Sequence, residues 1–385
     1  MLLSKMEGIP SLTARSHIFR QWSVTMYKTL RLHNFRGFSS YSLGDLTRIN
    51  LLVGKNNAGK TSILEAIEIL SHGGRPSSLL RSPSRRGEVT SESRDPALRA
   101  EYDIRYLFHQ HRIREGSTFE IQADKDLASP AIRCIIRRPE SEIEQLELSE
   151  QDEPSMTYEL FVTGPENGKG SIIKISTEGI LASDFRRGPI PYAQLAPPAA
   201  VFLGTEGADL NILQKMWDDI VLTSEEERII KALQIIEPRV ERLAFTGGSS
   251  RWSSIAWIKL KNDEERVPLG SLGDGIRRLL SLAIYAARAS GGILLIDEID
   301  TGLHYSTLKL MWQFITEVAI RLDIQVFATT HSGDCLRALA WLNEEKPGYE
   351  NIVSVYRVDR FSEQATRYSA GEIEVAERQQ IEVRG

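Results

Sequence analysis

Residues 54–62 carry the clearest chemical pattern in the chain, with the spacing Gly-x4-Gly-Lys-Thr. Gly54 and Gly59 let the backbone turn tightly and bring its N–H groups close to phosphate oxygens. Lys60 can place a positive charge beside the β- and γ-phosphates of a nucleotide, and the Thr61 hydroxyl can bind Mg²⁺. This spacing is typical of a phosphate-binding P-loop. The predicted nucleotide-binding residues are Gly54, Asn56, Asn57, Ala58, Gly59, Lys60, Thr61 and Ser62.

The segments on either side of this loop must position it. A chance glycine turn before an ordinary helix would give similar letters. However, the apolar run Ile49–Val53 predicts a buried strand before the loop. After the loop, Ile63, Ile67 and Leu70 recur at helical spacing, and Gly73 can end that helix. The order of strand, loop and helix is the one that a P-loop requires.

Two adjacent carboxylates, Asp297 and Glu298, follow a second apolar run at Ile293–Ile296. A buried strand that ends in such a pair has the form of a Walker B motif. Asp297 would hold Mg²⁺ together with Thr61, directly or through water, and Glu298 would orient and polarise the attacking water. The alternative is a strand whose acids merely begin a loop, and the upstream P-loop argues against it.

His331 follows a third short strand, predicted at Gln325–Ala328. Ligands bind at the carboxyl ends of strands in α/β sheets, so this histidine could reach a γ-phosphate. The alternative is an incidental histidine in a helix-capping turn. Earlier in the chain, Ser271–Gly275 is a small, flexible turn before an apolar helix predicted at Ile276–Ala289.

Taken in this order, the segments resemble the ATPase heads of RecF, SMC and OLD-family proteins. The nearest resemblance is to the stand-alone, OLD-like AAA ATPases of bacteria. Ser271–Gly275 resembles their signature motif, Asp300 their D-loop residue and His331 their switch histidine. The resemblance runs from about Tyr27 to the C-terminus, with a weak middle, and it rests on the joint presence of these motifs.

This resemblance implies an α/β P-loop NTPase of the ABC-head type, with a mixed sheet flanked by helices and an inserted subregion of strands and helices. It also implies hydrolysis of Mg-ATP by a dimer that holds two nucleotides between its subunits. Ser271 and Gly273 of one chain would then contact the ATP of the other. Relatives act on DNA in repair, chromosome organisation or phage defence, so DNA and an effector nuclease are candidate partners.

The chain departs from the family pattern in two ways. Asp274 stands nearest the place of the usual signature glutamine, which affects the contact across the dimer. OLD nucleases carry a TOPRIM nuclease domain after the ATPase, and the 54 residues that follow His331 are too few for one. We therefore expect any nuclease to reside in a partner protein.

The chain is expected to form one head over residues 26–385. Its parts are an N-lobe at 26–72, an inserted region at 73–245, a C-lobe at 246–345 and a C-terminal cap at 346–385. Residues 1–25 are basic and acid-poor. They predict a disordered extension or a start codon assigned too early.

The inserted region begins with Gly73–Arg99, which is rich in Ser, Arg, Pro and Gly and predicts a mobile loop. Its arginines Arg81, Arg85 and Arg86 could bind a phosphate backbone, but solvated side chains are the commoner case. Arg36, in a turn before the P-loop strand, raises the same two alternatives.

Further regular elements are predicted from apolar periodicity. A capping box is predicted from Ser224 to Glu227, and His109-Gln110-His111 lacks a nearby third ligand for a metal. The predicted strands are Tyr102–Phe108, Thr118–Gln122, Ile132–Ile136, Val240–Phe245 and Ser254–Lys261, with a hairpin of Tyr158–Val162 and Ser171–Ile175 and a mostly helical segment at 208–236.

Composition sets broad limits on function. The net charge of −5 gives no global nucleic-acid signature, so any DNA contact would be local. The only cysteines, Cys134 and Cys335, are far apart in sequence. They provide neither a disulfide framework nor a zinc cluster, which favours a reducing cytoplasm. No apolar run reaches membrane-spanning length.

The predicted reaction is hydrolysis of ATP to ADP and phosphate, with Lys60, Glu298 and His331 as catalytic residues. The main alternative is an ATP switch that hydrolyses slowly and gates a partner effector such as a nuclease. A GTPase would need a guanine-reading Asn-Lys-x-Asp motif, which the sequence lacks. A transporter ATPase would show a clearer signature motif and a membrane partner.

Overall fold

The computed structural model describes residues 26–88, 102–125, 128–139, 157–165, 167–176, 179, 200–247, 254–345, 351–379, 381 and 383. The predicted extension at 1–25 and the end of the predicted loop at 73–99 lie outside these residues. The strands are β1 (Thr29–Phe35), β2 (Phe38–Leu43), β3 (Ile49–Val53), β4 (Thr118–Asp124), β5 (Ala131–Arg137), β6 (Thr157–Gly164), β7 (Asn167–Ser176), β8 (Ala200–Leu203), β9 (Val240–Thr246), β10 (Ile255–Leu260), β11 (Arg266–Pro268), β12 (Ile293–Ile296), β13 (Gln325–Thr329), β14 (Val353–Arg357) and β15 (Thr366–Ser369). The helices are α2 (Lys60–Ser71), α3 (Arg81–Arg86), α5 (Leu210–Asp218), α6 (Ser224–Leu233), α7 (Asp274–Arg288), α8 (Tyr305–Arg321), α9 (Gly333–Glu345) and α10 (Ala370–Arg378).

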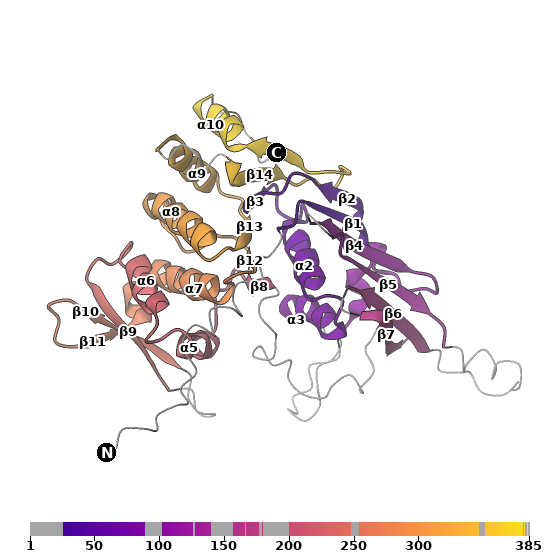
Figure 1. Cartoon of the computed structure of the whole chain (residues 1–385), viewed down its shortest axis with the longest axis horizontal. Coiled ribbons are helices and arrows are strands. Elements are labelled where there is room, and N and C mark those ends of the chain that lie inside the picture. Colours follow the sequence, from indigo (N-terminus) through magenta and orange to yellow (C-terminus); the bar gives the residue numbers. More distant parts are fainter. Residues whose placement is uncertain are drawn as a thin grey trace, which may run out of the picture.

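The central sheet has the order β15-β14-β3-β13-β12-β8 (Figure 1). Neighbouring strands from β14 to β8 pair in parallel, and β15 is antiparallel at one edge. β3, β12 and β13 are buried along their whole lengths. Parallel strands covered on both faces read as continuous apolar runs, which is why the sequence predicted these three strands correctly. The sheet is mixed, as expected.

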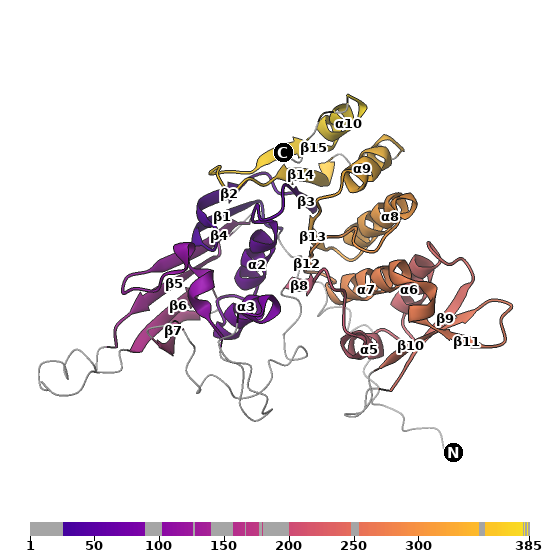
Figure 2. The same cartoon turned by 180° about the vertical axis from the view of Figure 1, so that it is seen from behind.

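Two hydrophobic cores lie on opposite faces of this sheet, because successive side chains of a strand point to opposite sides. Leu51 packs with the core formed by α7, α8, α9 and α10. Its neighbour Leu52 packs with the core formed by α2 and the antiparallel sheet β2-β1-β4-β5-β6-β7. Figures 1 and 2 show α2 between the two sheets and α7 to α10 on the far side. The helix after the P-loop is therefore covered on both sides.

The predicted inserted region contributes to several parts of the fold. Strands β4 to β7 complete the antiparallel sheet that β1 and β2 begin, and β8 forms an edge of the central sheet. Helices α5 and α6 pack against α7, and β9 forms a small sheet with β10 and β11. The lobe boundaries at residues 73 and 245 stay a prediction. Strands between these two residues extend both large sheets.

Two local predictions were wrong. Tyr102–Phe108 is not one strand, because Ile104–Leu107 forms a 3-10 helix whose first turn is capped by the Asp103 carboxylate. Ser224 does not cap α6, and the helix has a single side-chain cap from the preceding residue. Thr223 is the N-cap of α6, and its Oγ1 accepts a hydrogen bond from the Glu225 N–H at 3.2 Å. The second error arises because Thr223 and Ser224 are both short polar side chains that can cap a helix.

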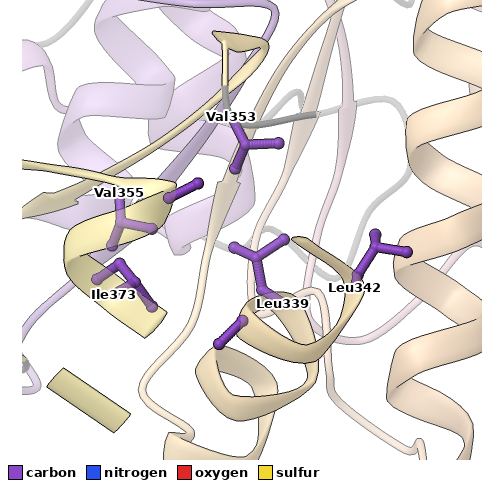
Figure 3. Close-up of a pocket in the computed structure, with 7 residues that line it drawn as sticks. Leu339, Leu342, Val353, Val355 and Ile373 are labelled. Carbon is purple, nitrogen blue, oxygen red and sulfur yellow. The ribbon is translucent and has the colours of Figure 1, made fainter. Parts of the chain in front are cut away.

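The C-terminal part of the described chain contains two helices and two strands. Helix α9 covers Gly333–Glu345, and strand β14 covers Val353–Arg357. Beyond them, β15 and α10 follow, with a capping box between Ser369 and Glu372. Side chains of α9, β14 and α10 surround a small apolar cavity, lined by Leu339, Leu342, Val353, Val355 and Ile373 (Figure 3).

The arginines predicted to be solvated form a charged network instead. Glu65 and Glu68 of α2 are each 1% exposed. Arg36 Nε lies 2.7 Å from Glu65 Oε2, and Arg86 Nε lies 2.7 Å from Glu65 Oε1. Arg85 forms an ion pair with Glu68, and Arg81 Nη1 lies 3.8 Å from Glu68 Oε1. Buried carboxylates need such partners, so these cations hold α3 against the P-loop helix.

We expect Glu65→Gln to lower the free energy of unfolding by about 3–5 kcal/mol, the usual cost of removing one partner of a buried ion pair. The substitution removes the carboxylate 2.7 Å from Arg36, which is 5% exposed, and leaves that arginine with Glu88 at 2.8 Å. Urea unfolding followed by circular dichroism measures the change. Glu317→Gln is a matched control, because Glu317 is 73% exposed beside Arg321 and such pairs contribute at most about 1 kcal/mol. Equal changes in the two variants would contradict the role of the network.

The described residues contain no cluster of metal ligands, no disulfide bond and no helix able to span a membrane. His109 and His111 lie in a short 3-10 helix, and no group of three or more metal-ligating side chains of His, Cys, Asp or Glu occurs in this part of the chain. Cys134 and Cys335 are buried free thiols. No helix within the described ranges has the length and apolar character needed to cross a membrane.

Candidate functional site

The P-loop connects the end of β3 to the first residue of α2. Gly54 has φ of +147°, and a Cβ there would lie 2.5 Å from the Val358 carbonyl oxygen. Gly59 has φ of +101°, and a Cβ there would collide with the ring of Phe38. Both positions therefore require glycine. Asn57 also has positive φ, at 62°. The next residue, Ala58, is buried.

The side chain of Lys60 turns back over this loop. Its Nζ donates hydrogen bonds to the carbonyl oxygens of Gly54 at 2.7 Å and Lys55 at 3.0 Å. Burial lowers the pKa of Lys60, and the nearby carboxylates of Asp297 and Glu298 oppose this shift. The lysine thus presents its charge across the loop and toward the Walker B carboxylates.

Thr61 and Asp297 bring two oxygen ligands together. Thr61 Oγ1 donates to Asp297 Oδ2 at 3.0 Å, although the residues are 236 positions apart. Thr329 Oγ1 donates to Asp297 Oδ1 at 2.6 Å. A hydroxyl and a carboxylate are hard oxygen donors of the kind that Mg²⁺ prefers. Mg²⁺ usually keeps several waters and takes phosphate oxygens as well, so these two residues fit a metal that arrives with a nucleotide.

Glu298 has an unusual backbone conformation, with φ of +48°. Its N–H donates to Thr329 Oγ1 at 2.8 Å. Its Oε2 accepts a hydrogen bond from Thr301 Oγ1 at 3.2 Å, and its Oε1 lies 3.5 Å from His331 Nδ1. The carboxylate is 36% exposed and the histidine 53%. Left-handed backbone at a non-glycine residue is typical of functional sites, and here it directs the carboxylate toward His331.

The order of the strands explains this convergence. β13 lies between β3, which leads into the P-loop, and β12, which ends in Asp297 and Glu298. All three strands are parallel, so their carboxyl ends meet at one edge, where ligands bind in α/β sheets. Thr329 and His331 at the end of β13 therefore stand between the P-loop and the Walker B pair.

The signature turn lies elsewhere. Ser271 and Gly273 are exposed, Gly273 has φ of +90°, and the turn leads into α7. α7 belongs to the core on the face of the central sheet opposite α2. Asp300 of the D-loop accepts a hydrogen bond from Thr330 Oγ1 at 2.6 Å. The structure thus brings Lys60, Thr61, Asp297, Glu298 and His331 together and leaves Ser271 and Gly273 on another surface.

The remaining P-loop residues differ in exposure, and two further residues beside the site were not predicted. Asn56 and Asn57 are exposed, and Ser62 is 8% exposed beneath Arg86, whose Nη2 lies 3.4 Å from Ser62 Oγ. Thr329 contacts both Walker B residues. The signal for Arg86 was available: two acids three positions apart in the P-loop helix, followed by an arginine-rich segment. Thr329 had no signal, because threonine is common in strands.

A family model and several known proteins match the chain. The model is described as "AAA domain, putative AbiEii toxin, Type IV TA system", and it matches residues 49–334. The ATP/GTP phosphatase of Helicobacter pylori is 22% identical over 353 residues, which cover 83% of this chain and 89% of that protein. The DNA replication and repair protein RecF of Francisella tularensis subsp. novicida is 56% identical over 43 residues, or 11% of this chain and 12% of RecF.

Two solved structures are similar over most of the chain at low identity. One is an SMC head bound to the C-winged helix domain of ScpA, with 14% identity, a TM-score of 0.47 and coverage of 89% of this chain and 97% of that chain. The other is an SMC head with an extended coiled coil, bound to the C-terminal domain of ScpA derived from Pyrococcus furiosus. It has 11% identity, a TM-score of 0.46 and coverage of 92% of this chain and 99% of that chain.

Proposed function

The chain belongs to the family of AbiEii-type AAA domains, with the fold of a RecF/SMC-like ABC-type ATPase head, and on this premise we propose that it hydrolyses Mg-ATP to ADP and phosphate. The observation that carries the proposal is the meeting of Thr61, Asp297, Glu298 and His331 through contacts of 3.5 Å or less. These side chains come from the first turn of α2 and from the ends of β12 and β13, and they meet beside the P-loop. A site that holds phosphates, a metal and an attacking water needs this set of groups.

Each residue has a distinct role in this proposal. The P-loop N–H groups and Lys60 bind the β- and γ-phosphates, and Thr61 and Asp297 would hold Mg²⁺. The metal, when bound, neutralises charge on the phosphate oxygens. Glu298 accepts the proton of the attacking water, and His331, 3.5 Å from Glu298 Oε1, senses the γ-phosphate. Asp300 positions Thr330 and the turn that carries His331.

Phosphate release from ATP by the full-length protein tests this function. GTP is the second candidate substrate, because the Helicobacter pylori relative is called an ATP/GTP phosphatase. Turnover should be measured with each nucleotide, with Mg²⁺ or with a chelator, and with and without DNA. We expect Mg²⁺-dependent release from ATP. A protein that binds ATP but releases no phosphate under any of these conditions would instead support the alternative of a switch that gates an effector.

The proposed setting is DNA repair or phage defence, with DNA and an effector nuclease as partners. The short match to RecF supports the first setting. The family description adds a toxin–antitoxin system. Stimulation of ATP turnover by DNA would favour repair, and its absence would favour the defence settings. The expected cytoplasmic location stays a prediction.

We further propose that ATP closes a homodimer. The P-loop helix α2 and the signature helix α7 lie in cores on opposite faces of the central sheet. One chain therefore offers its signature turn to a site other than its own P-loop. Two chains related by a two-fold axis can each complete the other's site. A γ-phosphate shifts this equilibrium only through contacts that exist in the closed state.

We expect ATP to double the mass of the Glu298→Gln protein in light scattering and ADP to reverse the change. The hydrolysis-deficient variant keeps ATP in place long enough for the measurement. Ser271→Arg should block closure by bulk and charge, because Ser271 is exposed at the signature turn, while each chain still binds ATP. If mass stays constant in all states, cross-linking through a cysteine placed near Ser271 reports closure. The proposed ATP-closed dimer is wrong if neither mass nor cross-linking responds to ATP and the Ser271→Arg protein hydrolyses ATP at the wild-type rate.

A further inference from the structure

Arg278 is a buried arginine at the junction of the signature helix and the Walker B turn. It lies in the second turn of α7 and is 5% exposed. Its Nη2 donates to the carbonyl oxygens of Asp297 at 2.9 Å and Glu298 at 2.8 Å. Its Nη1 donates to the carbonyl oxygen of Gly204, just after β8, at 2.7 Å. One guanidinium thus links three separate segments.

The Asp297 carbonyl lies beyond the strand ladder of β12, which ends at Ile296, so its donor must come from outside the sheet. The Glu298 carbonyl accepts the Thr301 N–H at 3.1 Å as well as the Arg278 guanidinium. Buried carbonyl groups without a partner are costly. Glu298 also holds φ of +48°, a conformation that persists only where the surroundings enforce it. Its N–H donates to Thr329 Oγ1, and its carbonyl accepts hydrogen bonds from Arg278 at 2.8 Å and from the Thr301 N–H at 3.1 Å. These contacts fix both ends of the residue, and Arg278 supplies the shorter of the two to the carbonyl.

The charge of Arg278 is arranged for this contact rather than for an ion pair. Within the part of the chain that the structure describes, no carboxylate lies within ion-pair distance of it. Burial lowers the pKa of Arg278 to about 10, and the carboxylates of Asp300, Asp297 and Glu298 act in the opposite direction. A planar guanidinium has several donors in a fixed fork, so it can reach carbonyls from two segments. A lysine ammonium also has several donors, but they all lie on one nitrogen.

We propose that Arg278 is a positioning residue for ATP hydrolysis, which holds the backbone of Glu298 so that its carboxylate faces the attacking water. The inference rests on the proposed hydrolysis at Glu298. Because Arg278 lies on the helix that begins at the signature turn, it also joins that turn to the catalytic carboxylate as one unit. A contact made by Ser271 or Gly273 across the dimer would therefore act directly on the position of Glu298.

A cavity beside Arg278 makes a sharp test feasible. It has a volume of about 190 Å³ and is lined by Arg278, Ser281, Thr205, Glu206 and other residues. Arg278→Ala would enlarge this space toward the carbonyls of Asp297 and Glu298. A guanidinium ion added in solution can then enter and replace the missing group. A residue needed only for folding would not be rescued in this way.

We expect Arg278→Ala to lower kcat for ATP by about 10- to 100-fold, the range seen when an outer partner of a catalytic ligand is lost. KM for ATP should stay within about twofold, because the P-loop contacts are unchanged. Millimolar guanidinium chloride, well below denaturing concentrations, should restore part of kcat. Arg288→Ala, at the far end of α7, is the matched control and should show neither effect.

A second variant covers the case in which Arg278→Ala does not fold. Arg278→Lys keeps the charge, but its single nitrogen cannot reach Gly204 on one side and Asp297 and Glu298 on the other, as Nη1 and Nη2 of Arg278 do, so kcat should fall and guanidinium should not restore it. Wild-type kcat in either variant, or loss of kcat in Arg278→Ala without rescue, overturns the positioning role. Unfolding of both variants would show a purely structural role and overturn it as well. If the wild-type protein itself releases no phosphate, the proposed function fails, and this inference fails with it.

Discussion

Lys60→Ala should weaken binding of an ATP analogue by about 10- to 100-fold or more. A hydrogen bond to a charged group is worth roughly 1.5–3 kcal/mol, and each 1.4 kcal/mol is a factor of about ten in Kd. Lys60 Nζ already lies against the carbonyls of Gly54 and Lys55, at 2.7 and 3.0 Å. Its charge is therefore within reach of phosphates bound in the same loop. Alanine would remove this charge from the loop.

Fluorescence anisotropy of a labelled, non-hydrolysable ATP analogue measures this change. Lys231→Ala is a suitable control, since Lys231 is an exposed lysine of α6 and its loss should leave Kd unchanged. Circular dichroism verifies that both variants are folded. Equal Kd values for Lys60→Ala and the wild-type protein would remove the P-loop assignment and with it the proposed function.

Glu298→Gln should slow ATP hydrolysis by about 10²- to 10⁴-fold, the usual contribution of a positioned general base. Glutamine has nearly the same shape, so it can still accept the hydrogen bond from Thr301 Oγ1 that Glu298 Oε2 accepts at 3.2 Å. It cannot take a proton from water. The amide should leave Mg-ATP bound, because Lys60, Thr61 and Asp297 are unchanged.

Single-turnover phosphate release, with ATP binding measured in parallel, separates the two effects. Glu227→Gln, at an exposed position in the first turn of α6, should hydrolyse ATP at the wild-type rate. If Glu298→Gln did so too, another residue would have to be the base. If it lost ATP binding as well, Glu298 would act in the ground state rather than in the chemical step.

The sequence predicted the parts of the site that depend on local pattern. The P-loop, the strand before Asp297 and the strand before His331 each combine an apolar run with polar residues at its end. Because parallel strands end at one edge of a sheet, three such segments were enough to predict that their polar ends meet. The antiparallel hairpin of β6 and β7 was predicted from apolar periodicity, which is also a local pattern.

What the sequence did not predict depends on partners far along the chain. Arg85 and Arg86 were expected to be solvated because the composition of residues 73–99 is typical of loops, and Arg36 was left open between solvent and phosphate. All three pair with buried acids of α2. Which acid an arginine meets is decided by packing and not by spacing. The same holds for Arg278, whose acceptors are main-chain carbonyls. A carbonyl has no signature in a sequence, so this contact was visible only in the fold.

The strand order of the central sheet has a consequence for synthesis of the protein. β3 leaves the ribosome early, but its two neighbours are β13 at Gln325–Thr329 and β14 at Val353–Arg357. At about 5–20 residues per second, roughly 15–60 s separate β3 from β14. Until then, a largely apolar strand with unpaired edges is a target for chaperones. The nascent P-loop lacks its supporting strands during this interval, so ATP can stabilise the chain only after β13 and β14 have been synthesised.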